Sequence, residues 1–114
     1  MQQNELPKAI KRAMRSLVGI AHETELKRAL EELYGNFQEW KSDEIDSIEL
    51  SDQIHNFHNG PNRDIYLRYA SKLDLRFLVR QALKEGTLQT AAIPKEVWPY
   101  LELSSHVSEN SLER

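Results

Sequence analysis

Cysteine is absent from the 114-residue chain. This absence excludes disulfides, thiol chemistry and thiolate metal sites, and it suits a reducing compartment. No apolar run approaches the ~20 residues that a membrane-spanning helix needs, and the segment after the N-terminus is amphipathic and not continuously hydrophobic. The sequence therefore predicts a cytoplasmic protein.

The common signatures of catalysis are also missing. The sequence has no glycine-rich phosphate loop, no Walker motif, no Gly-x-Ser-x-Gly turn and no His-Glu-x-x-His zinc motif. The period-two alternation of a half-buried strand does not occur either. These absences favour a non-enzymatic helical protein, for which we expect no cofactor.

The composition is typical of one small globular domain. Hydrophobic residues make up 39% of the chain and charged residues 29%, which is too apolar for a disordered protein. A chain of this length buries about two-thirds of its unfolded surface, enough for a single core. We expect one helical domain over residues 1–103 and a polar, frayed C-terminal tail over residues 104–114.

Charge is segregated along the chain, although the formal net charge is only −3. Residues 43–60 contain five acids and no Lys or Arg, whereas residues 61–84 contain six basic residues and two acids. Blocks of opposite charge often pair within a fold or across a dimer. The pattern favours a protein partner or a second copy of the chain.

Apolar residues recur at helical spacing through most of the sequence. Pro7 fits the first turn of a helix, whose apolar face comprises Ile10, Ala13, Met14, Leu17, Val18 and Ala21. A second apolar face lies elsewhere around the helix axis and comprises Leu26, Ala29, Leu30, Leu33, Phe37 and Trp40. This change of face predicts a break near Thr24 and two helices packed as a hairpin.

The next predicted helix has the clearest end signals. Asp46 and Glu49 form a capping box at its start. Gly60 is suited to a left-handed residue at its end, and Pro61 prevents continuation. The helix should therefore span about 47–59, with a buried stripe of Leu50, Ile54 and Phe57.

Three shorter helices complete the expected all-α fold. Asn62 caps one, with Ile65, Tyr69 and Leu73 buried, and Asp74 caps another that ends at Gly86, with Leu75, Leu78, Val79 and Ala82 buried. A final helix covers residues 94–101 and includes Trp98. The expected fold is a single-domain compact array of five to six helices, depending on whether 62–73 and 74–85 are one bent helix or two.

One aspartate and two histidines on the helix predicted over 47–59 form the first candidate site, which we call the histidine stripe. Asp52, His55 and His58 are three residues apart, so their side chains follow one stripe of a helix and could bind Zn²⁺ or Fe²⁺, or act as an acid–base pair. Helical metal sites normally use histidines four residues apart, or Glu-x-x-His pairs from two helices. The spacing therefore favours a stripe without metal, in which His58 packs at the edge of the core and His55 faces solvent or bonds Asp52.

A second candidate site comprises Arg63, Tyr66, Arg68 and Tyr69, which could bind an anion or stack on a base. Tyrosines at this spacing more often lie at the edge of a core.

The basic face of the first helix, together with residues 63–84, suggests a nucleic-acid-binding regulator, but a pI of about 5.8 argues against it. A protein-interaction module, most simply a homodimer, is the favoured function, with a metal-dependent protein and a nucleic-acid binder as alternatives.

We expect the purified protein to hold no stoichiometric transition metal. A helix projection places Asp52 and His55 away from the stripe that contains Leu50, so His55→Ala should move the thermal midpoint by no more than about 1–2 °C. Metal analysis and calorimetry check both expectations. About one zinc or iron per chain that is lost in His55→Ala and in His58→Ala would contradict them.

Overall fold

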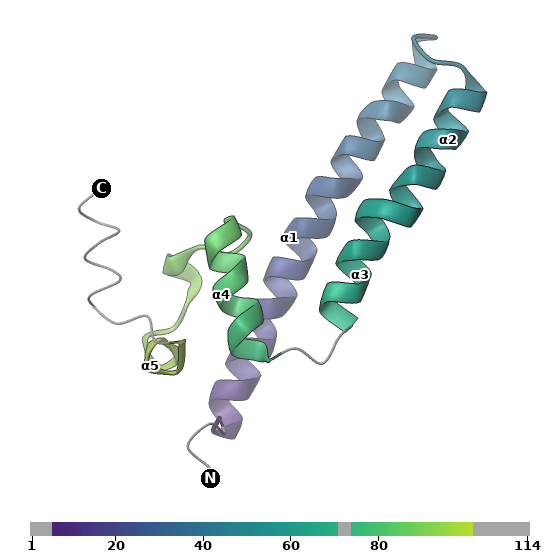
Figure 1. The fold of residues 1–114 in the computed structure, drawn as a ribbon. Helices are drawn as coiled ribbons and strands as arrows, with labels where there is room; N and C mark the ends of the chain where they lie inside the picture. Colours follow the sequence, from purple (N-terminus) through teal and green to yellow (C-terminus); the bar gives the residue numbers. More distant parts are fainter. Residues whose placement is uncertain (1–5, 71–73, 102–114) are drawn as a thin grey trace. The chain divides into compact units, whose positions relative to one another are not determined.

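Helices are the regular elements of the computed structural model, which describes residues 6–70 and 74–101 (Figure 1). In chain order these elements are α1 (Lys8–Lys41), α2 (Ser47–Phe57), the π-helical turn η2 (His58–Asn62), α3 (Arg63–Ala70), α4 (Leu75–Glu85), the 3-10 turns η3 (Thr90–Ala92) and η4 (Lys95–Val97), and α5 (Trp98–Leu101). The all-α prediction is confirmed. None of the described helices is long and apolar enough to cross a membrane.

The continuity of α1 shows that the predicted break near Thr24 is wrong. This helix runs through Thr24 for 34 residues, a length of about 51 Å. Of the described residues, 6–21 and 74–101 form one compact unit, the core unit, and 22–70 form another, the hairpin unit. The change of apolar face arises because α1 contributes to both units and packs a different side in each.

The core unit encloses one apolar cluster. Its largest fully buried side chains are Met14, Val79, Val97 and Leu101. The cluster is completed by Ile10, Leu17, Ala21, Ala82, Leu88 and Ile93. The predicted apolar faces of the first helix and of the helix after Asp74 are therefore confirmed, because both contribute to this cluster.

Both ends of α4 follow the predicted signals. The Asp74 carboxylate accepts a hydrogen bond from the Arg76 amide at 3.1 Å, as an N-cap residue does. Gly86 follows the helix with φ of 80°, the left-handed conformation that glycine adopts without a steric penalty. Residues 71–73, which include the predicted core residue Leu73, and the expected tail over 104–114 lie outside the described residues.

In the hairpin unit, the C-terminal part of α1 runs beside α2, η2 and α3 in the opposite direction (Figure 1). The Trp40 indole donates a hydrogen bond to the Ser47 hydroxyl at 3.0 Å, which links the two arms at the turn. The predicted N-cap is confirmed, because the Asp46 carboxylate accepts from the Glu49 amide at 2.7 Å. The predicted hairpin, made of the two halves of α1, is therefore wrong. The hairpin that the structure contains has residues 22–41 and 47–70 as its arms.

The predicted helix end at Gly60 and Pro61 is wrong. The chain passes from α2 to α3 through η2, which contains both residues, and Gly60 does not have a positive φ. A proline in a regular α-helix clashes with the carbonyl four residues earlier, and a wider π-turn is one way to relieve that clash. A glycine before proline also removes the Cβ that would crowd the proline ring in a helical conformation. Asn62 consequently lies inside the turn and does not begin a helix.

We expect two glycine-to-alanine substitutions to have opposite effects on stability. Gly86→Ala should cost about 1 kcal/mol, because alanine is disfavoured at a φ of 80°. Gly19→Ala, in the middle of α1, should instead stabilise the protein by about 0.5–1 kcal/mol. A Cβ at either position meets no atom within 4 Å, so the comparison isolates the backbone effect. Urea denaturation measures both, and equal midpoints for the two variants would contradict the assigned end of α4.

Candidate interaction surface on the hairpin

A polar cluster joins α1 to α3 inside the hairpin unit. Glu25 forms an ion pair with Arg68 and accepts a hydrogen bond from the Tyr69 hydroxyl at 2.9 Å. The ring of His22 stacks on that of Tyr69, with centroids 4.3 Å apart and planes inclined by 7°. Four side chains thus hold one end of the hairpin together, and the Glu25 carboxylate connects the two arms.

The cluster raises the pKa of the Tyr69 phenol to about 12. Burial is the largest cause because it disfavours the phenolate, and the hydrogen bond and negative charge of Glu25 act in the same direction, whereas Arg68 lowers the pKa. The pKa of Tyr69 in the folded protein exceeds the ordinary tyrosine pKa of 10.0. The neutral phenol therefore contributes stability that is complete below pH ~10 and is lost as the pH rises through ~12.

The predicted anion or base site is divided into two pairs of residues. Arg68 and Tyr69 belong to the cluster around Glu25. Arg63 and Tyr66 line a hollow of about 470 Å³ beside η2, together with His58, Asn59, Asn62 and Leu67. Arg68 and Tyr69 are therefore engaged inside the hairpin and are not grouped with Arg63 and Tyr66. Ligand binding by Arg63 and Tyr66 stays a prediction.

The histidine stripe has a different arrangement from that of a metal site. The His55 Nε2 atom accepts a hydrogen bond from the Asn59 amide at 3.0 Å, while Asp52 and His58 are exposed on the same arm. Across residues 6–70 and 74–101, no three His, Cys, Asp or Glu side chains are grouped so that they could hold a metal ion. The expected absence of metal in the purified protein remains a matter for metal analysis.

The largest difference from the predicted burial concerns the C-terminal part of α1. Leu33 and Trp40 are half-buried, as expected of residues facing the second arm. Leu30 is 46% exposed, and Phe37 is 37% exposed. Their predicted burial is wrong, because a single facing arm covers only part of the wide apolar arc on α1. Ile54 on α2, also predicted to be buried, is 39% exposed.

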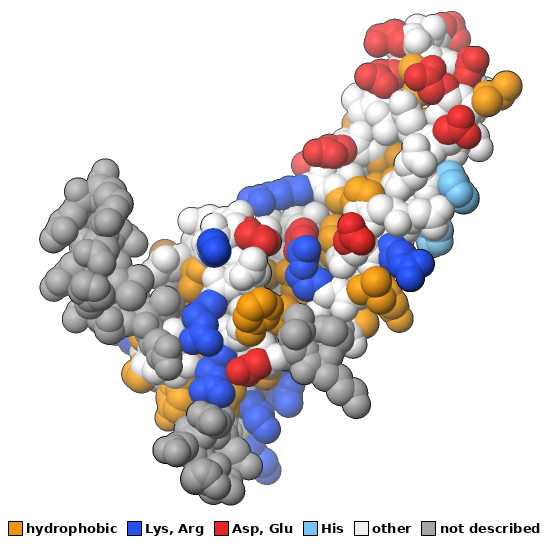
Figure 2. Space-filling model, viewed as in Figure 1, with side chains coloured by type: hydrophobic (Ala, Val, Ile, Leu, Met, Phe, Trp, Pro, Cys, Tyr) orange, Lys and Arg blue, Asp and Glu red, His pale blue; other side chains and the backbone are white. Residues whose placement is uncertain are grey.

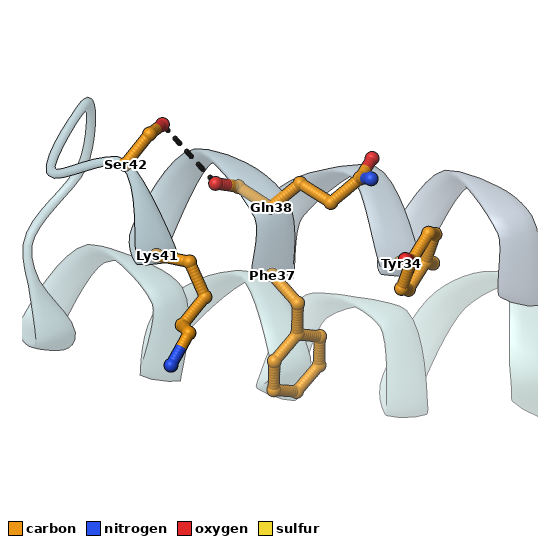
Figure 3. Close-up of a pocket in the computed structure, with 5 residues that line it drawn as sticks. All are labelled: Tyr34, Phe37, Gln38, Lys41 and Ser42. Carbon is orange, nitrogen blue, oxygen red and sulfur yellow. Dashed lines mark hydrogen bonds between the residues drawn. The ribbon is translucent and has the colours of Figure 1, made fainter.

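Four apolar residues follow one another along one side of α1, and we call them the α1 row: the half-buried Leu26 and the exposed Leu30, Tyr34 and Phe37. Tyr34 is 62% exposed and lies at its centre, where two shallow hollows meet. One hollow, of about 390 Å³, is lined by Glu23, Leu26, Lys27, Leu30, Glu31 and Tyr34. The other, of about 360 Å³, is lined by Tyr34, Phe37, Gln38, Lys41 and Ser42 (Figure 3). Helical spacing of four, four and three residues keeps the row on one side of α1.

Aromatic contacts hold one end of the α1 row in place. The Phe37 and Trp40 rings are 6.5 Å apart and nearly perpendicular, at 89°, a preferred arrangement for aromatic pairs. The Lys41 ammonium lies 5.9 Å from the Trp40 ring centroid, at the outer limit of a cation–π contact. Phe37 is therefore held in position while part of its ring stays open to a partner.

Charged side chains surround this apolar surface unevenly. Figure 2 shows acidic side chains gathered at the turn between α1 and α2, where Asp43, Glu44, Asp46 and Glu49 are exposed. Along the α1 row itself the charges alternate in sign, from Glu23 and Lys27 to Glu31 and Lys41. A mixed border of this kind can orient a partner through charge complementarity.

The basic face predicted on the first helix is exposed, as expected, at Lys8, Lys11, Arg12 and Arg15.

The sequence analysis did not single out Tyr34, which lines both hollows of the α1 row. The available signal was the width of the second apolar face, which is broader than one neighbouring helix can cover.

Comparison of the chain with protein-family models, curated proteins and solved structures finds no match.

We expect Tyr69→Phe to destabilise the protein by about 1 kcal/mol, because Glu25 loses a hydrogen bond while the stack on His22 is retained. Tyr66→Phe is the matched control, since Tyr66 is 66% exposed, and it should change stability by less than about 0.5 kcal/mol. Urea denaturation measures both. In a spectrophotometric titration, the tyrosine with a pKa of about 12 should be missing from Tyr69→Phe and present in Tyr66→Phe. Retention of that late titration would contradict its assignment to Tyr69.

Proposed function

We propose that this protein is a non-enzymatic interaction module that binds a helix of a protein partner on the α1 row. The observation that supports the proposal is the exposure of three large apolar side chains, Leu30, Tyr34 and Phe37, on one side of the hairpin unit. Exposed apolar residues are ordinary when they are scattered, whereas a contiguous group marks a contact surface.

The free energy available from covering the row is substantial for so small a unit. Full burial of a Leu or Phe side chain contributes about 1.5–3 kcal/mol. Leu30 and Phe37 are 46% and 37% exposed, so covering each contributes about 1 kcal/mol. Tyr34 adds a larger exposed ring whose hydroxyl can stay in contact with water. These contributions offset part of the roughly 4–15 kcal/mol that association costs, and the surface that the partner buries must supply the rest.

A helix is the partner shape that the row suits best. Anchors spaced by three and four residues along one helix match the ridges and grooves of a second helix packed at 8–10 Å. The two hollows follow one another along α1, so a long element can occupy both. The two alternative functions, a metal-dependent protein and a nucleic-acid binder, stay predictions, and no observation favours either of them over an interaction module. The cytoplasmic location also stays a prediction.

A photocrosslinking amino acid at position 34 tests the proposal directly. With benzoylphenylalanine in place of Tyr34, irradiation of the full-length protein in an extract of its source cells should give a crosslinked protein adduct. The same amino acid in place of Gln89, which is exposed in the core unit, serves as the control and should give little adduct. Mass spectrometry identifies the crosslinked protein, including a second copy of this chain. No adduct at position 34, or equal adducts at both positions, would contradict the proposal.

A further inference from the structure

We infer that the partner on the α1 row is a second copy of this chain, with the two α1 helices antiparallel about a two-fold axis near residue 32. This inference rests on the proposed function and identifies its partner. A two-fold contact requires one surface to be complementary to itself, so that residue i contacts residue j of the other copy and j contacts i. The α1 row meets that requirement when the axis lies near residue 32.

The apolar residues of the row pair with one another in this register. With the axis near residue 32, Leu30 of each copy lies opposite Tyr34 of the other, and both residues are about half exposed or more. Phe37 lies opposite Lys27, where the ammonium can contact the face of the ring and the aliphatic stem can cover it. Leu26 lies opposite Gln38, which lines the adjoining hollow. Each apolar anchor thus meets a side chain that can cover it.

The charges at the two ends of the row match in the same register. Glu23 lies opposite Lys41 of the other copy, and the symmetry produces this pair twice. Both residues line the hollows that the row contains. A contact centred on Leu30 would place Glu23 opposite Phe37 and leave Lys41 beyond the row, so it would lose the charge pairs. Charge complementarity between Glu23 and Lys41 therefore favours the register near residue 32 over the register centred on Leu30.

Glu23 and Lys41 cannot form this pair within one chain. They are separated by 18 residues of the continuous helix α1, which places them about 27 Å apart along its axis. Any energetic coupling between substitutions at these two positions must consequently arise between two copies. This separation makes a charge-reversal experiment decisive.

The experiment measures self-association of the full-length protein by sedimentation equilibrium at low salt, where exposed ion pairs are least screened. The wild-type protein should dimerise by ~100 μM. Glu23→Lys and Lys41→Glu should each weaken the dimer roughly tenfold, because each replaces two attractive pairs by two like-charged pairs. The double variant restores opposite charges at both ends, and its dimer should be within about threefold of the wild-type affinity.

Mixing the two single variants gives an independent readout. In a dimer of one Glu23→Lys chain with one Lys41→Glu chain, the introduced lysine faces the introduced glutamate at one end. At the other end the native Lys41 faces the native Glu23, so both ends carry opposite charges again. Native mass spectrometry should therefore show the mixed dimer in excess over either homodimer. Glu39→Lys is the matched control, since Glu39 is exposed on the side of α1 opposite the row, and it should leave the dimer unchanged.

Three results would overturn the inference: a monomeric wild-type protein at ~100 μM, single variants that dimerise as well as Glu39→Lys, or a double variant no better than the singles. The proposed function can be judged separately by the crosslink at position 34. A monomer whose position 34 crosslinks to a different protein removes self-association and leaves the interaction function standing. The absence of any crosslink at position 34 would contradict both the self-association and the proposed interaction function.

Discussion

The unbroken course of α1 is the constraint on which the rest of the structure depends. One helix of 34 residues supplies an arm to each of two compact units. Its first part packs Met14 and Leu17 into the core unit, and its second part faces α2 and α3. The apolar surface of α1 changes side along its length, which agrees with its having different neighbours in its two parts. That change is visible in the sequence, because the two parts of α1 pack against different elements.

The two units differ in how completely they cover their apolar residues. In the core unit α4 and the following turns surround α1, and four large side chains there have almost no exposed surface. The hairpin unit has two arms, so each helix has one covered side and a flank left open. Among the residues of this unit that the structure describes, Leu50 and Ile65 are the buried apolar ones. Leu30 and Tyr34 remain on the flank. This unequal coverage is the physical basis of the proposed interaction surface.

Polar contacts offset part of this limited burial. Glu25 binds both Arg68 and Tyr69, and Trp40 binds Ser47 near the other end. These contacts hold the two arms in one register, which apolar contact alone specifies weakly. The same contacts separate the four predicted ligand-binding residues, because Arg68 and Tyr69 bind the Glu25 carboxylate while Arg63 and Tyr66 line a hollow beside η2.

The sequence by itself determined the helical class, the caps at Asp46 and Asp74 and the left-handed Gly86, because these follow from local backbone chemistry and from periodicity. Only the tertiary structure decided that α1 is continuous, that Gly60 and Pro61 lie inside a π-turn, and that Leu30 is exposed. Each of these depends on which neighbour lies against a helix. Periodicity records that a face is apolar, but it carries no information about whether one arm, several arms or a second chain covers that face.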